Sequence, residues 1–165
     1  MKNTIKNTKV LITGALGQNG IILSSLLLKK KYQVFGWIKN KKYNNKVNGV
    51  SYQIVNLETK NNVLKILKKI NPSAIIHFAA ENPSYLDKKS NKNFYIKNYR
   101  SSKNIIDSIK FLNLNTYFIF ANSSQIFKKK NNIKYKETDK FVKRDAYTKF
   151  RLNIFNYLET INKKD

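Results

Sequence analysis

A glycine-rich turn near the N-terminus has the residue types and the spacing of a phosphate-binding site. It follows a short apolar run and leads directly into a helical pattern. In such a turn the first glycine permits a sharp bend, the second lets the backbone approach a pyrophosphate, and the third lets the helix pack closely on the strand. Free amides at the helix start then face the negative phosphates. The predicted dinucleotide contacts in this turn are Gly14, Ala15, Gly17, Gln18, Asn19 and Gly20.

The residues after the second apolar run indicate which dinucleotide the turn would hold. An acidic residue at that strand end would bind a free ribose 2′-hydroxyl and repel a 2′-phosphate. The chain has Lys39-Asn40-Lys41-Lys42 there and no acid. This favours NADP, with Lys39 and Lys41 as candidate contacts of the 2′-phosphate. NAD stays the alternative, because lysine is abundant along the whole chain.

These residues need a scaffold of alternating strands and helices, and the apolar pattern predicts one. Short β-like runs alternate with segments whose apolar residues recur at helical spacing. This alternation predicts right-handed crossovers and a doubly wound parallel α/β sheet with helices on both faces. Residues 122–142 are expected to form an irregular connection. The predicted strands are 9–13, 33–38, 51–55, 74–78 and 116–121, and the predicted helices are 18–30, 59–70, 93–112 and 143–161.

Length and composition limit the class of protein further. The 165 residues suit one domain with a single core, so 1–165 are expected to form one dinucleotide-binding domain. The chain has no cysteine, which excludes disulfides and thiolate chemistry and fits a reducing cytoplasm. We expect no metal site. No apolar run suits a signal peptide or approaches the ~20 residues of a membrane span, so a cytoplasmic protein without a membrane partner is expected.

The charge balance is strongly basic, with 33 basic and 9 acidic residues and a net charge of +24. Such a charge is typical of a nucleic-acid or anionic-membrane binder, or of compositional drift toward A/T-rich codons. Nearly all the basic residues are lysines spread along the chain, whereas base-reading surfaces favour arginine for its bidentate fork. Drift is therefore the favoured interpretation, and no specific nucleic-acid partner is expected. Nonspecific adhesion to polyanions at low salt is expected in either case.

The glycine spacing Thr-Gly-x-x-Gly-x-x-Gly resembles that of the extended short-chain dehydrogenase/reductase family, which includes NAD(P)-dependent sugar-nucleotide epimerases and dehydratases. Residues 11–36 look most like the GDP-mannose 4,6-dehydratase branch. Other family motifs follow in order, at 55–57, 77–80, 98, 121–127 and 136–147. The resemblance implies a Rossmann fold and a nucleotide-sugar substrate. It also implies cofactor contacts at Asn56, Leu57, Phe78, Ala79, Ala80 and Asn98.

The resemblance also implies a proton-transfer site. In the family, a tyrosine and a lysine four residues later share one helix face. The lysine lowers the tyrosine pKa and binds the nicotinamide ribose, and the phenolate takes a proton from a sugar hydroxyl as hydride passes to the cofactor. A serine or threonine after the fifth strand bonds the same hydroxyl. By resemblance these catalytic positions are Tyr147, Ser123 and Arg151, and Tyr147 and Arg151 also touch the cofactor.

Three features depart from the family pattern. Arg151 replaces the lysine, keeping the charge on a bulkier and planar group. Gln125 stands at the position where dehydratases place a catalytic glutamate, and an amide cannot accept that proton, so 4,6-dehydration by the usual route is not expected. Asn56 replaces an aspartate but can still hydrogen-bond adenine. Family members usually continue for a further stretch of similar size, so the chain is expected to be a fragment, a truncated product or a minimal relative.

Three functions remain open at this point. The first is an NADP-dependent epimerase, reductase or dehydratase relative that acts on a sugar hydroxyl. The second is a non-catalytic dinucleotide-binding module, suggested by Arg151, Gln125 and the short chain. The third is a nucleic-acid binder that reuses the fold, suggested only by the charge. By resemblance, a homodimer through helices 93–112 and 144–161 is also expected, although the like charge opposes it.

Overall fold

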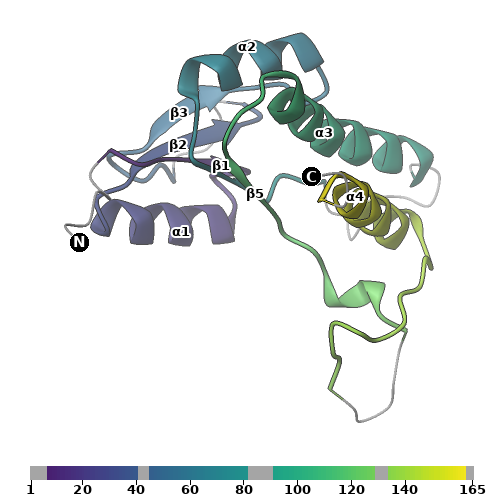
Figure 1. The fold of residues 1–165 in the computed structure, drawn as a ribbon. Coiled ribbons are helices and arrows are strands. Elements are labelled where there is room, and N and C mark those ends of the chain that lie inside the picture. The colour runs from purple at the N-terminus through teal and green to yellow at the C-terminus, as the bar shows by residue number, and fades with distance from the viewer. Residues whose placement is uncertain (1–6, 41–44, 82–90, 129–133, 163–165) are drawn as a thin grey trace. The chain divides into compact units, whose positions relative to one another are not determined.

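The computed structural model describes residues 7–40, 45–81, 91–128 and 134–162. Its described strands form one parallel sheet in the order β3-β2-β1-β4-β5 (Figure 1). Helices connect most successive strands, which confirms the predicted α/β fold class. The strands are β1 (Lys9–Thr13), β2 (Gln33–Ile38), β3 (Ser51–Ile54), β4 (Ala74–His77) and β5 (Tyr117–Phe120). The helices are α1 (Gln18–Lys29), α2 (Lys60–Ile70), α3 (Asn91–Phe111), the short 3₁₀ turn η3 (Ser124–Ile126) and α4 (Ala146–Asn162).

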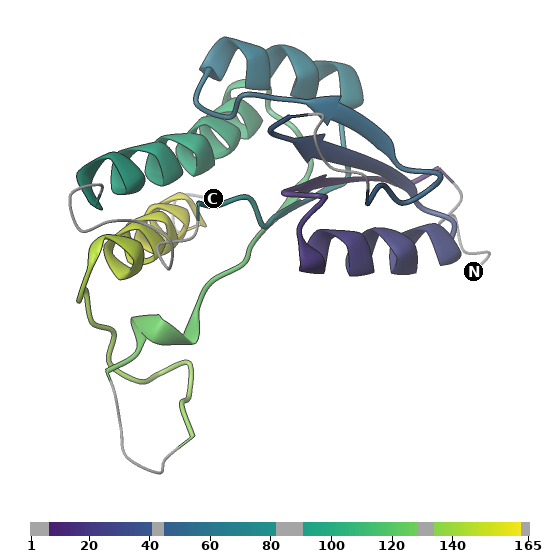
Figure 2. The same cartoon turned by 180° about the vertical axis from the view of Figure 1, so that it is seen from behind.

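The chain divides into two compact units. The first, the sheet unit, comprises 1–80 and 104–121 and contains all five strands. Helix α1 covers one face of this sheet, and α2 with the end of α3 covers the other (Figures 1 and 2). The α1 face is filled by an apolar cluster around Val10, Ile12, Val34, Ile38 and Ile76. The opposite face is filled by Leu11, Trp37, Val55, Val63, Leu67, Ile70, Ile75 and Ile105.

Strand β5 has a neighbour on one side only within the described sheet. Its side chains alternate between the two faces, as strand geometry requires. Phe118 packs against the α2 face, whereas Tyr117 and Ile119 are 80% and 53% exposed. The edge of the sheet therefore carries two large apolar side chains that other described residues leave largely uncovered.

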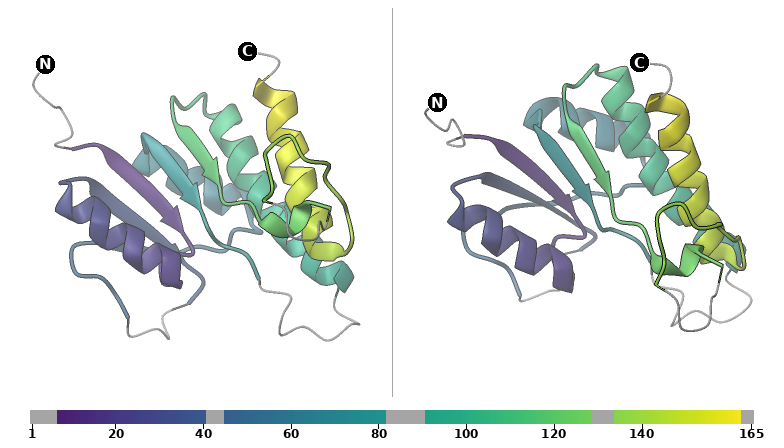
Figure 3. Two further views of the ribbon diagram at one scale, coloured as in Figure 1. Left: turned by 90° about the horizontal axis from the view of Figure 1, so that it is seen from below. Right: turned by 60° about the horizontal axis from the view of Figure 1, so that its bottom comes forward.

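The second unit, the tyrosine unit, comprises 81–103 and 122–165. It contains the first part of α3, η3 and α4, and Figure 3 shows the two long helices side by side. The Lys149 ammonium lies 5.4 Å from the ring centroid of Tyr95, and the Asn153 side-chain amide donates to the Tyr95 hydroxyl at 2.7 Å. About two helical turns further along both helices, the Lys103 ammonium lies 4.8 Å from the Tyr157 ring centroid. Because early residues pair with early ones and late with late, α3 and α4 run parallel.

The start of α4 differs from the predicted boundary for a local chemical reason. The pattern predicts a helix from residue 143, but α4 begins at Ala146. The Asp145 carboxylate accepts the backbone N–H of Thr148 at 2.7 Å, which is the bond of a helix N-cap. In the described parts of the preceding connection, 122–128 and 134–145, the chain is irregular as predicted, except for η3 and a bridge between Phe127 and Phe141.

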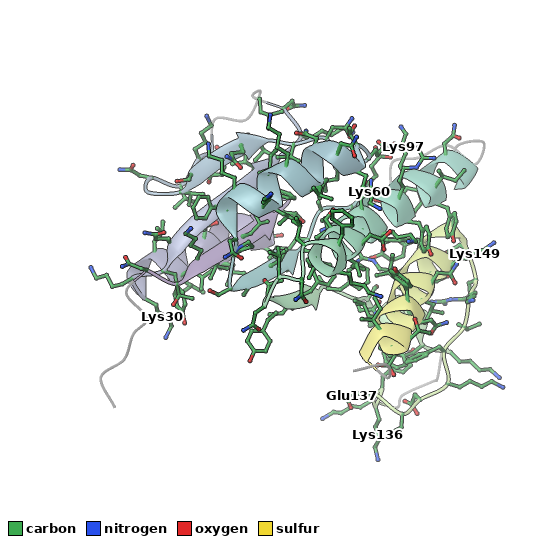
Figure 4. The ribbon with its side chains drawn as sticks, turned by 45° about the horizontal axis from the view of Figure 1, so that its top comes forward. Lys30, Lys60, Lys97, Lys136, Glu137 and Lys149 are labelled. Carbon is green, nitrogen blue, oxygen red and sulfur yellow. The ribbon has the colours of Figure 1, made fainter. Side chains whose placement is uncertain are left out.

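Exposed lysines occur in the described parts of both units. The five labelled lysines in Figure 4 are all exposed and lie far apart in the sequence. They are Lys30, Lys60, Lys97, Lys136 and Lys149. Among the described segments, no helix combines the length and the apolar character needed to cross a membrane.

Candidate functional site

The glycine turn leaves β1 in a conformation that only glycine adopts without strain. Gly14 has φ of +67°, in the left-handed region. The amides of Gly14 and Ala15 both donate to the Trp37 carbonyl, at 3.1 and 3.4 Å, which ties the turn to β2. A Cβ at Gly14 would lie 2.9 Å from the amide nitrogen of Ala79. The turn is therefore pressed against the segment that follows β4.

The start of α1 is open in the way that a bound diphosphate requires. Gly17 is the exposed N-cap residue, no side chain caps the helix, and the first turn contains no acid. The helix-start amides of exposed Gln18 and Asn19 are therefore available to an anion. Gly20 is buried, and a Cβ there would lie 2.5 Å from the Gly14 carbonyl oxygen. The third glycine thus lets the helix approach the turn itself, a closer contact than the expected packing on the strand.

The turn lies where the order of the strands reverses. Strands β2 and β3 lie on one side of β1, and β4 and β5 on the other. In open parallel sheets, ligands bind outside the carboxyl ends of the strands at such a point. The predicted residues Phe78, Ala79 and Ala80 follow β4 directly. The structure therefore brings the predicted turn and the predicted residues after β4 together at the carboxyl ends of β1 and β4.

A buried hydrogen bond joins these two segments, and the sequence pattern did not predict it. The Thr13 hydroxyl lies 2.6 Å from Nδ1 of His77, and both residues are buried. The same Thr13 oxygen accepts the Ala79 N–H at 3.2 Å. The available signal was the chain's single histidine at the end of a buried strand, together with a threonine just before the first glycine.

The residues predicted to lie near the adenosine part of a dinucleotide have mixed surroundings. Asn56 is exposed, and its side-chain oxygen accepts the Glu58 N–H at 3.0 Å. Leu57 packs against the core, and its carbonyl accepts the Asn104 side-chain amide at 2.9 Å. Lys39 is exposed just after β2, whereas Lys41 lies outside the described residues.

In the tyrosine unit, Asn98 is buried and holds backbone groups. Its side-chain oxygen accepts the Glu81 N–H at 2.9 Å, and its side-chain nitrogen donates to the Phe94 carbonyl at 3.1 Å. Asn98 therefore ties the Glu81 amide to α3. Its predicted contact with a cofactor stays a prediction.

Tyr147 and Arg151 are neighbours on one face of α4, as the spacing predicts. Tyr147 is half-buried and Arg151 is only 8% exposed. The guanidinium carbon of Arg151 lies 4.9 Å from the Tyr147 ring centroid and 5.1 Å from that of Phe150. Burial lowers the pKa of the Arg151 guanidinium from its ordinary value, while Tyr147 raises it through charge and a hydrogen bond. The pair places a cation directly beside a phenol.

Ser123 and Gln125 belong to the η3 turn, which packs against α4. The Ser123 hydroxyl is half-buried and accepts the Gln125 N–H at 3.3 Å, so it caps this short turn. Gln125 is exposed, and its backbone carbonyl accepts a hydrogen bond from the Arg144 guanidinium. Within the described ranges, no group of three His, Cys, Asp or Glu side chains could hold a metal ion.

Comparison with solved structures shows the same fold in proteins about twice as long. The chain matches UDP-glucose 4-epimerase of Thermus thermophilus in complex with NAD, with a TM-score of 0.82, 20% identity, and coverage of 94% of this chain and 51% of that one. It matches the UDP-Glc/GlcNAc 4-epimerase of Campylobacter jejuni with a TM-score of 0.85, 18% identity, and coverage of 96% and 50%. It also matches UDP-glucose 4-epimerase of Brucella ovis in complex with NAD, with a TM-score of 0.82, 18% identity, and coverage of 93% and 47%. The chain spans about half the length of these proteins.

Comparison with curated proteins found no match. The model of the NAD dependent epimerase/dehydratase family matches residues 10–165, which is nearly the whole chain. The match includes the glycine turn, the segment after β4 and the tyrosine helix. The chain belongs to the NAD dependent epimerase/dehydratase family.

Proposed function

We propose that the chain is the dinucleotide-binding part of an NADP-dependent oxidoreductase that acts on a hydroxyl of a nucleotide sugar. The observation that carries the proposal is the uncapped glycine turn at the point of strand reversal. Gly14 and Gly20 make it too close-packed for side chains, and exposed Gly17 leaves the helix start open. Such a turn holds a pyrophosphate through backbone amides.

The preference for NADP is supported by the residues after β2. The described residues there, Lys39 and Asn40, are exposed and neither is acidic. An aspartate at this position would repel a 2′-phosphate, and a lysine attracts it. The solved relatives named above include complexes with NAD, so a direct comparison of the two dinucleotides is the appropriate measurement.

The proposed proton transfer rests on the Tyr147–Arg151 pair. When bound, the nicotinamide ring supplies the hydride acceptor. Tyr147 would take the proton of the sugar hydroxyl, and Ser123 would bond the same oxygen. A cation held beside a phenol stabilises the anion that forms when the phenol loses its proton, and Arg151 holds its charge there. Because Gln125 offers an amide and no carboxylate, we propose epimerase or reductase chemistry rather than 4,6-dehydration.

The substrate is proposed by resemblance. Residues 11–36 look most like the GDP-mannose 4,6-dehydratase branch, whereas the solved relatives named above are epimerases of UDP sugars. GDP-mannose and UDP-glucose are therefore the two nucleotide sugars to test first.

The binding experiment compares NADP and NAD by calorimetry in the parent chain, in Gly17→Leu and in Asn61→Leu. Asn61 is exposed on α2, so its variant controls for an added surface leucine. We expect NADP to bind more tightly than NAD. We expect Gly17→Leu to weaken binding at least about tenfold, because its side chain would stand at the exposed helix start where the pyrophosphate is proposed to bind. A Cβ there would also lie 3.2 Å from the Gly14 carbonyl oxygen, so the melting temperature of the variant is recorded in parallel. Unchanged affinity in Gly17→Leu would contradict the proposed site.

The second candidate function, a non-catalytic dinucleotide-binding module, is favoured by the burial of Arg151 and its contacts with the rings of Tyr147 and Phe150. A side chain committed to packing has less freedom to reach a ribose. Hydride exchange with either nucleotide sugar separates the candidates. The enzyme loses turnover in Tyr147→Phe and keeps it in Tyr135→Phe, which removes an exposed hydroxyl of the same unit. Exchange in the parent chain that Tyr147→Phe abolishes would contradict the non-catalytic module.

A further inference from the structure

The single histidine of the chain occupies a buried position beside the glycine turn. His77 ends β4 and is 1% exposed, and its ring centroid lies 5.9 Å from those of Phe118 and Phe120. In register, His77 is the β4 partner of Thr13, the last residue of β1. Burying an imidazole costs free energy unless its nitrogens are hydrogen-bonded. The 2.6 Å bond between Nδ1 and the Thr13 hydroxyl meets this requirement for one nitrogen.

Counting donors and acceptors limits the direction of that bond. A threonine hydroxyl has one hydrogen to donate and two lone pairs that accept, and one lone pair of the Thr13 oxygen accepts the Ala79 N–H. Two arrangements fit the 2.6 Å contact: the hydroxyl donates to Nδ1 of a ring that carries its hydrogen on Nε2, or the hydroxyl accepts a hydrogen from Nδ1. The first arrangement also gives the hydroxyl hydrogen an acceptor.

The Ala79 amide is consequently held from two sides. It donates to the Thr13 hydroxyl at 3.2 Å, and the Gly14 backbone packs so closely that a Cβ would come within 2.9 Å of its nitrogen. Gly14 begins the phosphate turn, and Ala79 follows the strand on the other side of the reversal point. One hydroxyl thus sets the spacing between both segments.

We infer that His77 is a positioning residue of the dinucleotide site: its Nδ1 orients the Thr13 hydroxyl, which fixes the Ala79 amide against Gly14 and so sets the shape of the phosphate turn. The inference rests on the proposed function and gives a role to His77, which belongs to the motif at 77–80 but is not among the cofactor contacts that the resemblance implies. His77 acts through Thr13 and not by touching the dinucleotide.

The first test measures NADP and NAD affinity of the whole chain by calorimetry, with melting temperatures recorded in parallel. Thr13→Val keeps the side-chain shape and removes the hydroxyl, whereas Thr13→Ser keeps the hydroxyl. We expect Thr13→Val to weaken dinucleotide binding about tenfold, and Thr13→Ser to bind like the parent. The matched control is Ser108→Ala, which removes another buried hydroxyl of the sheet unit, one that donates to the Asn104 carbonyl. It should lower the melting temperature without changing the affinity.

The second test begins with the parent protein. Because the chain has one histidine, ¹⁵N-histidine labelling yields the two nitrogen resonances of His77 alone. We expect the hydrogen on Nε2 and a hydrogen-bonded, unprotonated Nδ1, and we expect the Nδ1 resonance to shift in Thr13→Val and to stay in place in Thr13→Ser. A hydrogen on Nδ1 of the parent protein overturns the inference. So does a Thr13→Val protein that binds dinucleotide like the parent. A parent chain that binds neither NADP nor NAD contradicts the proposed function instead, and the resonances still report whether the hydrogen bond exists.

Discussion

Arg151 illustrates how a single residue serves both packing and chemistry. Its guanidinium lies over the rings of Tyr147 and Phe150 and is almost completely buried. Burial lowers the pKa of the guanidinium, and the adjacent Tyr147 partly offsets this. Arginine keeps its proton under all ordinary conditions, so the site retains a fixed positive charge. The flat guanidinium stacks on a ring in a way that a lysine ammonium does not.

We therefore predict that Arg151→Met lowers the free energy of unfolding by about 1–2 kcal/mol, since a desolvated cation–π contact is of this size. Lys149→Met is the matched control, because Lys149 is exposed on the same helix and its ammonium lies 5.4 Å from the Tyr95 ring centroid. An exposed contact contributes about 0.5–1 kcal/mol, so the control should lose less. Urea denaturation of both variants measures the difference. Equal losses would show that the Arg151 stack contributes no more than a surface contact.

The sequence predicted those local arrangements that depend on residue type and short spacing. The Tyr147–Arg151 pair is one, because four residues along a helix fix a distance, and the glycine turn is another, because glycine alone fits its backbone without strain. The Thr13–His77 bond joins residues 64 apart in the chain. No local pattern contains that distance, and it follows only from the parallel register of β1 and β4.

Three helices are followed by residues whose backbone lies in the left-handed region. These residues are Lys31, Asn71 and Asn113, and none of them is a glycine. After α1, the Tyr32 N–H donates to the Leu27 carbonyl at 3.1 Å and the Lys31 N–H to the Leu28 carbonyl at 2.9 Å. This pair of bonds is the Schellman motif, in which glycine is the preferred residue.

Lys31→Gly is accordingly predicted to stabilise the protein by about 0.5–1 kcal/mol, because a lysine at φ of 66° pays a left-handed penalty that glycine avoids. Lys30→Gly removes the same charge one residue earlier, where φ is −85°, and should give no gain. Urea denaturation decides between them. If both variants change stability alike, the effect comes from lost charge and the conformational argument fails.

Each strand begins and ends within one residue of its predicted boundary. The compact apolar runs made this possible, because glycine or polar residues mark most of their ends. The predicted start of α4, at residue 143, was three residues too early. The Asp145 cap, and not the apolar periodicity, sets where this helix begins. The η3 turn and the Phe127–Phe141 bridge were not predicted. They depend on contacts across an irregular segment, which apolar spacing does not encode.

For the molecule as a whole, the net charge of +24 is the dominant long-range term. Like charges repel one another in the compact state, and salt screens this repulsion. We predict that the melting temperature rises between low and physiological ionic strength. Potassium chloride and potassium glutamate should act alike if screening is the cause, whereas a gain with one anion only would indicate specific anion binding. A melting temperature that falls with salt would show that attractive ion pairs dominate.

We also propose that two copies pair through α3 and α4, which the family resemblance suggests. The same repulsion acts between copies, so the dimer fraction is predicted to increase with salt. Sedimentation velocity over the same salt series measures it. A monomer at every salt concentration would contradict the proposed dimer.

The exposed Tyr117 and Ile119 on the edge strand β5 give the lysine-rich surface a second consequence. An open strand edge with large apolar side chains is a template for aggregation, and lysine is a residue that proteins use to prevent it. Charge that weakens the fold would then preserve solubility. Salt, or a polyanion that neutralises the lysines, should make each molecule harder to melt and at the same time easier to precipitate.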